Sequence, residues 1–194
     1  MTVRNPTPLH PFQPPTLTPH LLQDTIRRPN TSRQPVSRVH IDQTAASTAQ
    51  RVQRHAPSPA AADALLATSR YRIINVWRPL NADPVEASPL AFARSASLRD
   101  SDVVPVEHRY PASAGGYVGQ TAAIRYDAGQ EWYYLSGMTG DERILLECFD
   151  SEALKEGSGV KGGRVPHTAF EDPRTRVGAV PRESIEVRAL VFGP

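Results

Sequence analysis

Apolar and polar residues alternate along several short runs of the chain, a pattern typical of β-strands. Turn-forming segments such as DAGQ and MTGDE separate the later runs, and Pro79 ends one of the earlier ones. The predicted strands are Val36–Asp42 and the runs YRIINVWRPL, YVGQTAAIRY, EWYYLSG, RILLECFD, RVPHTAF and SIEVRALVF. The pattern therefore predicts a mainly β protein.

Two segments in the first half of the chain have the start signals of helices. Thr44 precedes AASTAQRVQR, and Ser58-Pro59 precedes PAAADALLATS; threonine and serine are good N-caps and proline suits the first turn. Residues 81–116 show little periodicity and many turn residues, which predicts a long loop or several short pieces. Short early helices followed by strands are consistent with a sandwich or barrel.

Length and composition favour one domain with long loops. The chain has 194 residues, 19 of them proline, which suits strands and turns better than a helical bundle. Residues 1–30 are rich in proline and threonine and poor in aromatic residues, so we expect a disordered tail there. Residues 31–194 are expected to form a single domain.

Charge and cysteine content exclude several classes of protein. The 22 basic residues are spread among 20 acidic ones without a basic tract, which argues against nucleic-acid binding. No apolar run reaches the roughly 18 residues that cross a bilayer, and the amino-terminal region lacks the apolar centre of a secretion signal. The single cysteine, Cys148, cannot form an internal disulfide and suits a reducing compartment. We expect a cytoplasmic protein that binds neither membrane nor nucleic acid; its oligomeric state does not follow from the sequence.

The stretch SRVHIDQT contains a candidate half of a metal site. Residues two apart on a strand point the same way, so His40 and Asp42 would aim at one point. Alone, such a pair more often consists of two polar residues that face water.

Two later features add to this pair. His167 lies in the extended stretch VPHTAF, and Arg182-x-Ser184 opens the final strand. Two histidines and one carboxylate on one face of an ion are the ligands of non-haem Fe(II) oxygenases. An arginine beyond the second histidine, helped by a serine, would bind the distal carboxylate of 2-oxoglutarate.

The sequence also resembles a family of fungal proteins, the AsaB-type hydroxylase/desaturases, which includes gibberellin-desaturase-like and cephem-methoxylase-related proteins. The resemblance extends from about Asp24 to Phe192. The stretches that carry it are RVHIDQT, RIINVWRPL, SPLAFARS, EWYYLSGM, ECFDS, PHTAFEDP and PRESIEVRALVF. It implies an oxidoreductase of secondary metabolism built on the double-stranded β-helix (jelly roll) of 2-oxoglutarate oxygenases.

The resemblance implies a role for each of these residues. His40, Asp42 and His167 would bind Fe(II), and Arg182 and Ser184 would bind 2-oxoglutarate, for hydroxylation or desaturation of a small metabolite. Family members have a folded region before the block DTIRRP, where this chain has about 23 proline-rich residues. The jelly roll would therefore be incomplete at its amino-terminal side. Two alternatives remain open: a cupin-type metal-binding hydrolase or isomerase that does not use Arg182, and a truncated, inactive relative that only binds a partner.

Five other side chains have expected roles. Asn75 and Trp77 would share one face of their strand, where Asn75 could hydrogen-bond the keto acid and Trp77 would pack in the core. Arg188 has the same parity as Arg182, and a structural ion pair is its expected role. His108 is expected at the surface, and Cys148 is expected to be a small buried residue.

Overall fold

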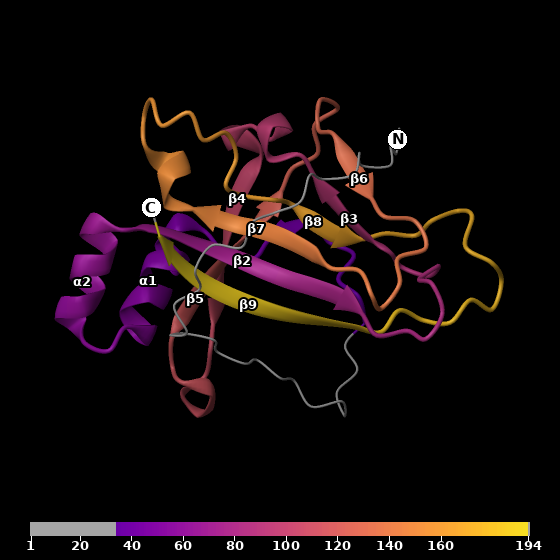
Figure 1. Ribbon diagram of the computed structural model, residues 1–194, viewed down its shortest axis with the longest axis horizontal. Coiled ribbons are helices and arrows are strands. Elements are labelled where there is room, and N and C mark those ends of the chain that lie inside the picture. Colours follow the sequence, from indigo (N-terminus) through magenta and orange to yellow (C-terminus); the bar gives the residue numbers. More distant parts are fainter. Residues whose placement is uncertain (1–33, 194) are drawn as a thin grey trace.

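Two antiparallel sheets form the body of the protein in a computed structural model that describes residues 34–193 (Figure 1). The larger sheet has the strand order β4-β5-β1-β8-β3-β6, and the smaller has the order β7-β2-β9. The strands are β1 (His40–Ile41), β2 (Arg70–Pro79), β3 (Leu90–Ala93), β4 (Val103–Arg109), β5 (Val118–Ile124), β6 (Trp132–Tyr134), β7 (Ile144–Asp150), β8 (His167–Ala169) and β9 (Ser184–Gly193).

Two α-helices, α1 (Ala45–His55) and α2 (Pro59–Thr68), connect β1 to β2. Thr44 caps α1 in a reciprocal capping box with Ser47, and Ser58 caps α2, whose first residue is Pro59. Both helices begin where their start signals predicted. Short 3₁₀ turns occur at Ser95–Ser97, Asp100–Asp102, Ala112–Ala114 and Ser151–Leu154.

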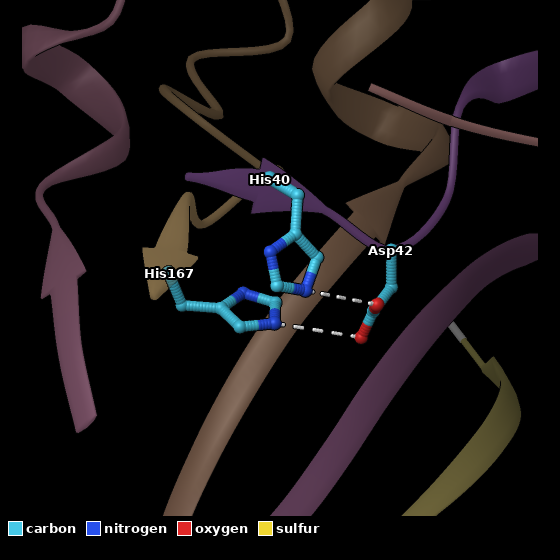
Figure 2. A group of neighbouring side chains, drawn as sticks. All are labelled: His40, Asp42 and His167. Atoms are coloured by element: carbon cyan, nitrogen blue, oxygen red, sulfur yellow. Dashed lines mark ion pairs between the residues drawn. The ribbon is translucent and has the colours of Figure 1, made fainter. Parts of the chain in front are cut away.

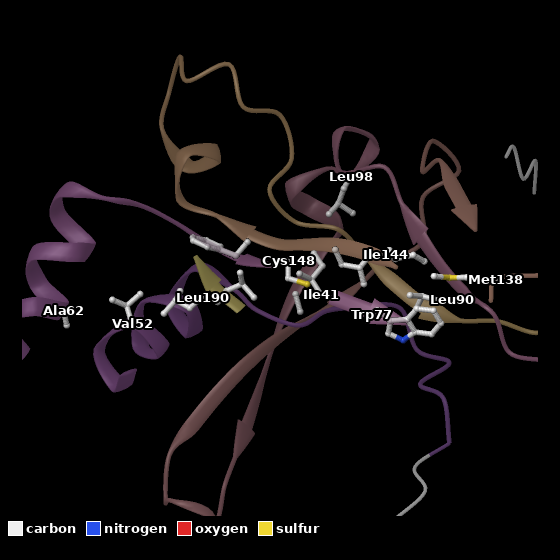
Figure 3. Close-up of a cluster of buried hydrophobic side chains, with 14 residues drawn as sticks. Ile41, Val52, Ala62, Trp77, Leu90, Leu98, Met138, Ile144, Cys148 and Leu190 are labelled. Atoms are coloured by element: carbon white, nitrogen blue, oxygen red, sulfur yellow. The ribbon is translucent and has the colours of Figure 1, made fainter. Parts of the chain in front are cut away.

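The hydrophobic core lies between the two sheets (Figure 3). Every second residue of β2 from Ile73 onward is buried, so Ile73, Asn75 and Trp77 share the inner face, as the alternation predicted. Ile41 of β1 and Leu146 of β7 are each 1% exposed and pack in the same cluster. Burial of such aliphatic side chains stabilises the fold by about 1.5–3 kcal/mol each.

Two parts of the chain differ from the sequence-based prediction. The strand expected over Val36–Asp42 has regular pairing only at His40–Ile41, although the Val36 carbonyl accepts a hydrogen bond from the Ala169 amide. Residues 81–116 form several short pieces, which was one of the two predicted alternatives, but these pieces include two strands that were not predicted, β3 and β4.

Within the described residues, 34–193, no helix has the length and apolar character needed to span a bilayer. The expected tail at residues 1–30 lies outside that range.

Candidate metal centre

Neighbouring strands bring the two candidate histidines together. His40 of β1 is directly opposite His167 of β8 in an antiparallel register, and directly opposed residues project from the same face. Their ring centroids are 4.5 Å apart. Asp42 follows β1 and has the same parity as His40, so its carboxylate points toward both rings (Figure 2). One potential ligand atom from each of the three residues lies within 4.8 Å of the others.

Backbone carbonyls orient both imidazoles. His40 Nδ1 is 2.8 Å from the Arg38 carbonyl, and His167 Nδ1 is 3.1 Å from the Val165 carbonyl. A carbonyl only accepts, so each Nδ1 carries a proton, and in the neutral imidazole Nε2 then presents a lone pair. Metal-binding histidines are oriented by the same kind of hydrogen bond. The Nε2 atoms lie 3.6 Å and 3.5 Å from the two Asp42 carboxylate oxygens.

Two polar side chains from the opposite sheet hold the Asp42 carboxylate. Asn75 Nδ2 donates to Asp42 Oδ2 at 2.5 Å, and the Arg188 guanidinium contacts the same oxygen at 2.7 Å. Arg188 also donates through Nε to Asn75 Oδ1 at 3.1 Å and pairs with Glu186 at 3.3 Å. Asn75 and Arg188 are directly opposed on β2 and β9, which explains why they meet. Asp42 Oδ1 is left facing His40.

The electrostatics of the cluster favour an ionised carboxylate. Burial opposes ionisation of Asp42, but contact with His167 and the charge of Arg188 outweigh it and hold the pKa of this carboxyl well below its usual range. Burial, together with the charge of His167, lowers the pKa of His40. Burial also works against a charged His167, but the contact with Asp42 is stronger and raises the pKa of His167.

The donor set fits a divalent transition metal. Two neutral imidazole nitrogens and one carboxylate oxygen converge from one side, and this combination suits iron, manganese or zinc. Each of the three side chains is already oriented by hydrogen bonds to the backbone or to neighbouring side chains. A metal ion could therefore bind without rearrangement of these side chains.

A cavity of about 410 Å³ opens beside the cluster between α1 and the β4–β5 hairpin. Its lining includes His40, Asp42 and Arg188 of the cluster, together with Arg51 of α1 and Tyr117. Its volume is within the range of small-ligand sites.

Arg182 and Ser184 lie apart from this cavity. The Arg182 guanidinium donates to the Ser88 carbonyl at 2.7 Å and lies 5.2 Å from the centroid of the Trp77 ring. Its Nε is buried without a hydrogen-bond partner among the described residues, and burial lowers the pKa of Arg182 to about 10. Ser184 begins β9 opposite Pro79, and its side chain is exposed.

The structure adds detail for four further residues, Arg188, His108, Cys148 and Arg51. Arg188 forms the expected ion pair, but its partners include the candidate ligand Asp42. His108 was expected at the surface; it lines the cavity and contacts the Thr121 hydroxyl at 2.8 Å. Cys148 is fully buried as predicted, and burial raises the pKa of its thiol well above the usual value. Sequence reasoning missed Arg51, although its spacing from Ser47 on a capped helix signals a shared face.

The fold and the cluster together describe an antiparallel β protein in which two histidines and one carboxylate converge. Non-haem iron oxygenases use the same ligand set. Comparison with known proteins agrees. The family model described as oxidoreductase/YMDC permease-like domain matches residues 18–192. The hydroxylase/desaturase poxK of Penicillium oxalicum is 41% identical over 189 residues, which covers 89% of this chain and 57% of the relative. The hydroxylase/desaturase asaB of Aspergillus flavus is 40% identical over 137 residues, covering 66% of this chain and 57% of the relative.

Solved structures of a third relative are also similar. The iron and alpha-ketoglutarate-dependent endoperoxidase NvfI matches with a TM-score of 0.72 and 33% identity, over 87% of this chain and 58% of that one. The corresponding sequence, from Aspergillus novofumigatus, is named an Fe(II)/2-oxoglutarate-dependent dioxygenase. The chain therefore belongs to this oxidoreductase family, among the fungal hydroxylase/desaturases, as its sequence motifs indicated. It spans a little over half the length of these relatives.

Proposed function

We propose that this chain carries the metal centre of an Fe(II)- and 2-oxoglutarate-dependent oxygenase that hydroxylates or desaturates a small metabolite. The observation that carries the proposal is the convergence of His40 Nε2, His167 Nε2 and the Asp42 carboxylate, with both Nδ1 atoms at backbone carbonyls. The names of the relatives support the same activity. A cytoplasmic location fits a chain with a single, unpaired cysteine.

We infer that residues 31–194 form one jelly-roll domain. The facing sheets, with β1-β8-β3 on one side and β7-β2-β9 on the other, support this architecture. The likeness to NvfI also supports it, with a TM-score of 0.72.

In this proposal each residue of the cluster has a defined task. Fe(II) bound there would couple the oxidative decarboxylation of 2-oxoglutarate by O₂ to oxidation of a C–H bond of the substrate. His40, Asp42 and His167 would hold the ion on one side and leave its other side open toward the cavity. Asn75 and Arg188 would act as positioning residues, because they fix the Asp42 carboxylate and keep it ionised.

Arg182 is the proposed partner of the distal keto-acid carboxylate, with Ser184 assisting. A buried guanidinium is costly without an anion, and within residues 34–193 Arg182 has no carboxylate partner. Even with its lowered pKa of about 10 it is a cation at neutral pH. Its ring partner Trp77 is two residues from Asn75 on the inner face of β2, which puts Arg182 next to the layer that holds Asp42.

The test is anaerobic titration of the full chain with Fe(II) and then 2-oxoglutarate. The expected result is metal uptake followed by a weak visible metal-to-ligand band. Metal uptake without the band would indicate a cupin-type metal protein, and no uptake would indicate an inactive relative; either outcome overturns the proposal. His167→Ala should abolish Fe(II) uptake. His55→Gln on α1, a histidine outside the cluster, should not.

A second measurement tests the clamp separately. Arg182→Gln should weaken 2-oxoglutarate binding about tenfold or more while Fe(II) stays bound. Binding of 2-oxopentanoate, which has a methyl group in place of the distal carboxylate, should be unchanged. Equal binding of 2-oxoglutarate to Arg182→Gln and the parent chain would overturn the assignment of Arg182.

A further inference from the structure

The cavity beside the metal centre has a strongly cationic wall. Arginines Arg38, Arg51, Arg54 and Arg188 line it, while Asp42 is its only carboxylate among the described residues. Asp42 is already engaged by Arg188, so its charge is compensated before any ligand arrives. A low-dielectric cleft lined by one sign of charge concentrates ligands of the opposite sign.

The arginines differ in whether they are free to bind a ligand. Arg188 is committed to Asp42, Glu186 and Asn75. Arg54 is exposed, and its guanidinium lies 3.5 Å from the centroid of the Tyr117 ring. Arg38 is exposed and contributes its carbonyl to His40. Each of these three arginines therefore already has a contact within the protein or is exposed to solvent.

Arg51 has no such commitment. Its Nε is buried and has no hydrogen-bond partner, and no carboxylate pairs with its guanidinium within residues 34–193. Burial and the neighbouring charge of Arg188 lower the pKa of Arg51, so a second cation is held close to the first. Two neighbouring guanidiniums that are partly buried repel each other unless an anion lies between or beside them.

The local structure fixes Arg51 in this position. Thr44 caps α1 and its hydroxyl contacts Gln120 of β5 at 2.5 Å, which ties the start of the helix to the β4–β5 hairpin. Ser47 and Arg51 are four residues apart and therefore project from one face of the helix, and both line the cavity. Arg51 is thus held on a capped helix that is tied to the sheet, rather than on a mobile loop.

We propose that Arg51 is the anchor for a carboxylate group of a ligand that enters this cavity and reaches the metal centre. A guanidinium binds a carboxylate through two parallel hydrogen bonds, which would satisfy the orphaned Nε. The carboxylate can belong to the substrate, or it can be the distal carboxylate of the keto acid, in which case Arg51 takes the role proposed above for Arg182. The inference deepens the proposed function, because it names carboxylates as the chemical class of ligand that the site binds. It rests on the proposed function only where the carboxylate belongs to the keto acid.

Two pairs of probes distinguish the sources. The first is 2-oxoglutarate with 2-oxopentanoate, measured anaerobically on the Fe(II) form. The second is 4-phenylbutyrate with the uncharged 4-phenylbutanamide, measured by calorimetry on the full chain with and without Fe(II) and 2-oxoglutarate. The variants are Arg51→Gln, Arg51→Lys and, as a control, Arg143→Gln, which changes an arginine that donates to the Gly140 carbonyl outside the cavity.

Arg51→Gln should weaken binding of one of the two probes, 2-oxoglutarate or 4-phenylbutyrate, about tenfold or more. Binding of the paired compound, which lacks the carboxylate in question, should be unchanged. Arg51→Lys should retain part of the affinity, and Arg143→Gln should match the parent. Selective loss of 2-oxoglutarate assigns Arg51 to the keto acid, and selective loss of 4-phenylbutyrate assigns it to the substrate carboxylate. Unchanged binding of both 2-oxoglutarate and 4-phenylbutyrate in Arg51→Gln overturns the proposal. A parent chain that binds neither of them more tightly than its paired compound also overturns it.

Failure of the proposed function gives a different pattern. If the parent chain takes up no Fe(II) but still binds 4-phenylbutyrate in an Arg51-dependent way, the carboxylate site stands and the oxygenase proposal fails.

Discussion

Replacement of Asn75 by leucine tests whether the residues behind Asp42 are part of the metal centre. Asn75 is fully buried, donates to Asp42 Oδ2 and accepts from Arg188 Nε. Leucine has a similar size but neither donates nor accepts. Asp42 would lose one of its two supports from the opposite sheet, and Arg188 Nε would lose its acceptor.

The size of the effect follows from these two contacts. A hydrogen bond to a charged group contributes about 1.5–3 kcal/mol, and loss of a group that orients a metal ligand costs about 10- to 100-fold in metal affinity. We therefore expect Asn75→Leu to bind Mn(II), a redox-stable probe, about 10- to 100-fold more weakly than the parent chain. Calorimetric titration measures the affinity, and urea unfolding of the metal-free protein measures the separate loss of stability.

Asn81→Leu is the matched control. Asn81 also makes two hydrogen bonds, to the Pro181 carbonyl and the Glu183 amide, but these join loops away from the cluster. It should lower stability without changing Mn(II) affinity. If Asn75→Leu binds Mn(II) within about threefold of the parent, a difference of well under 1 kcal/mol, the positioning role assigned to Asn75 is wrong.

Two further predictions concern the fold. Asp150→Asn should lower the free energy of unfolding by about 3 kcal/mol in urea titrations, because Asp150 is 1% exposed and its carboxylate accepts from Arg70 Nε at 3.0 Å. The pKa of Asp150 is lowered: burial opposes this, but the contact with Arg70 outweighs it. The stabilisation should therefore be complete above the unfolded-state pKa of about 4 and should shrink as the pH falls through the folded-state pKa; a pH-independent difference would contradict this account. Gly163→Ala should destabilise by about 2 kcal/mol or more, because a Cβ there would lie 2.7 Å from Asp150 Cβ at a φ of +66°. Gly157→Ala, at a φ of +75° with no atom within 4 Å of the new Cβ, should cost about 1 kcal/mol, and equal losses in thermal unfolding would show that the steric argument fails.

Elements with local signals were predictable from the sequence. Thr44 and Ser58 cap α1 and α2 through contacts made within one turn, so the sequence alone locates both helix starts. Strand β4 was missed because Pro105 reads as an interruption. The strand tolerates proline because β4 is an edge of its sheet, where one side of the backbone needs no partner.

The candidate site was predictable only in part. The spacing of His40 and Asp42 gives their shared direction, but the approach of His167 depends on the register between β1 and β8, which no local pattern specifies. The roles of Asn75 and Arg188 depend on the packing of the second sheet over the first. The buried carboxylate of Asp150 likewise depends on a partner 80 positions away in the chain, Arg70.

The direct pairing of His40 with His167 also has a thermodynamic consequence. Most of the described chain lies between these two residues, so an ion bound by both would close a very long loop, and closing such a loop is entropically costly. Any ligand that binds only the folded form shifts the folding equilibrium by mass action. Chelators should therefore lower the melting temperature of this protein, and the concentration of free metal would set how much of it is folded.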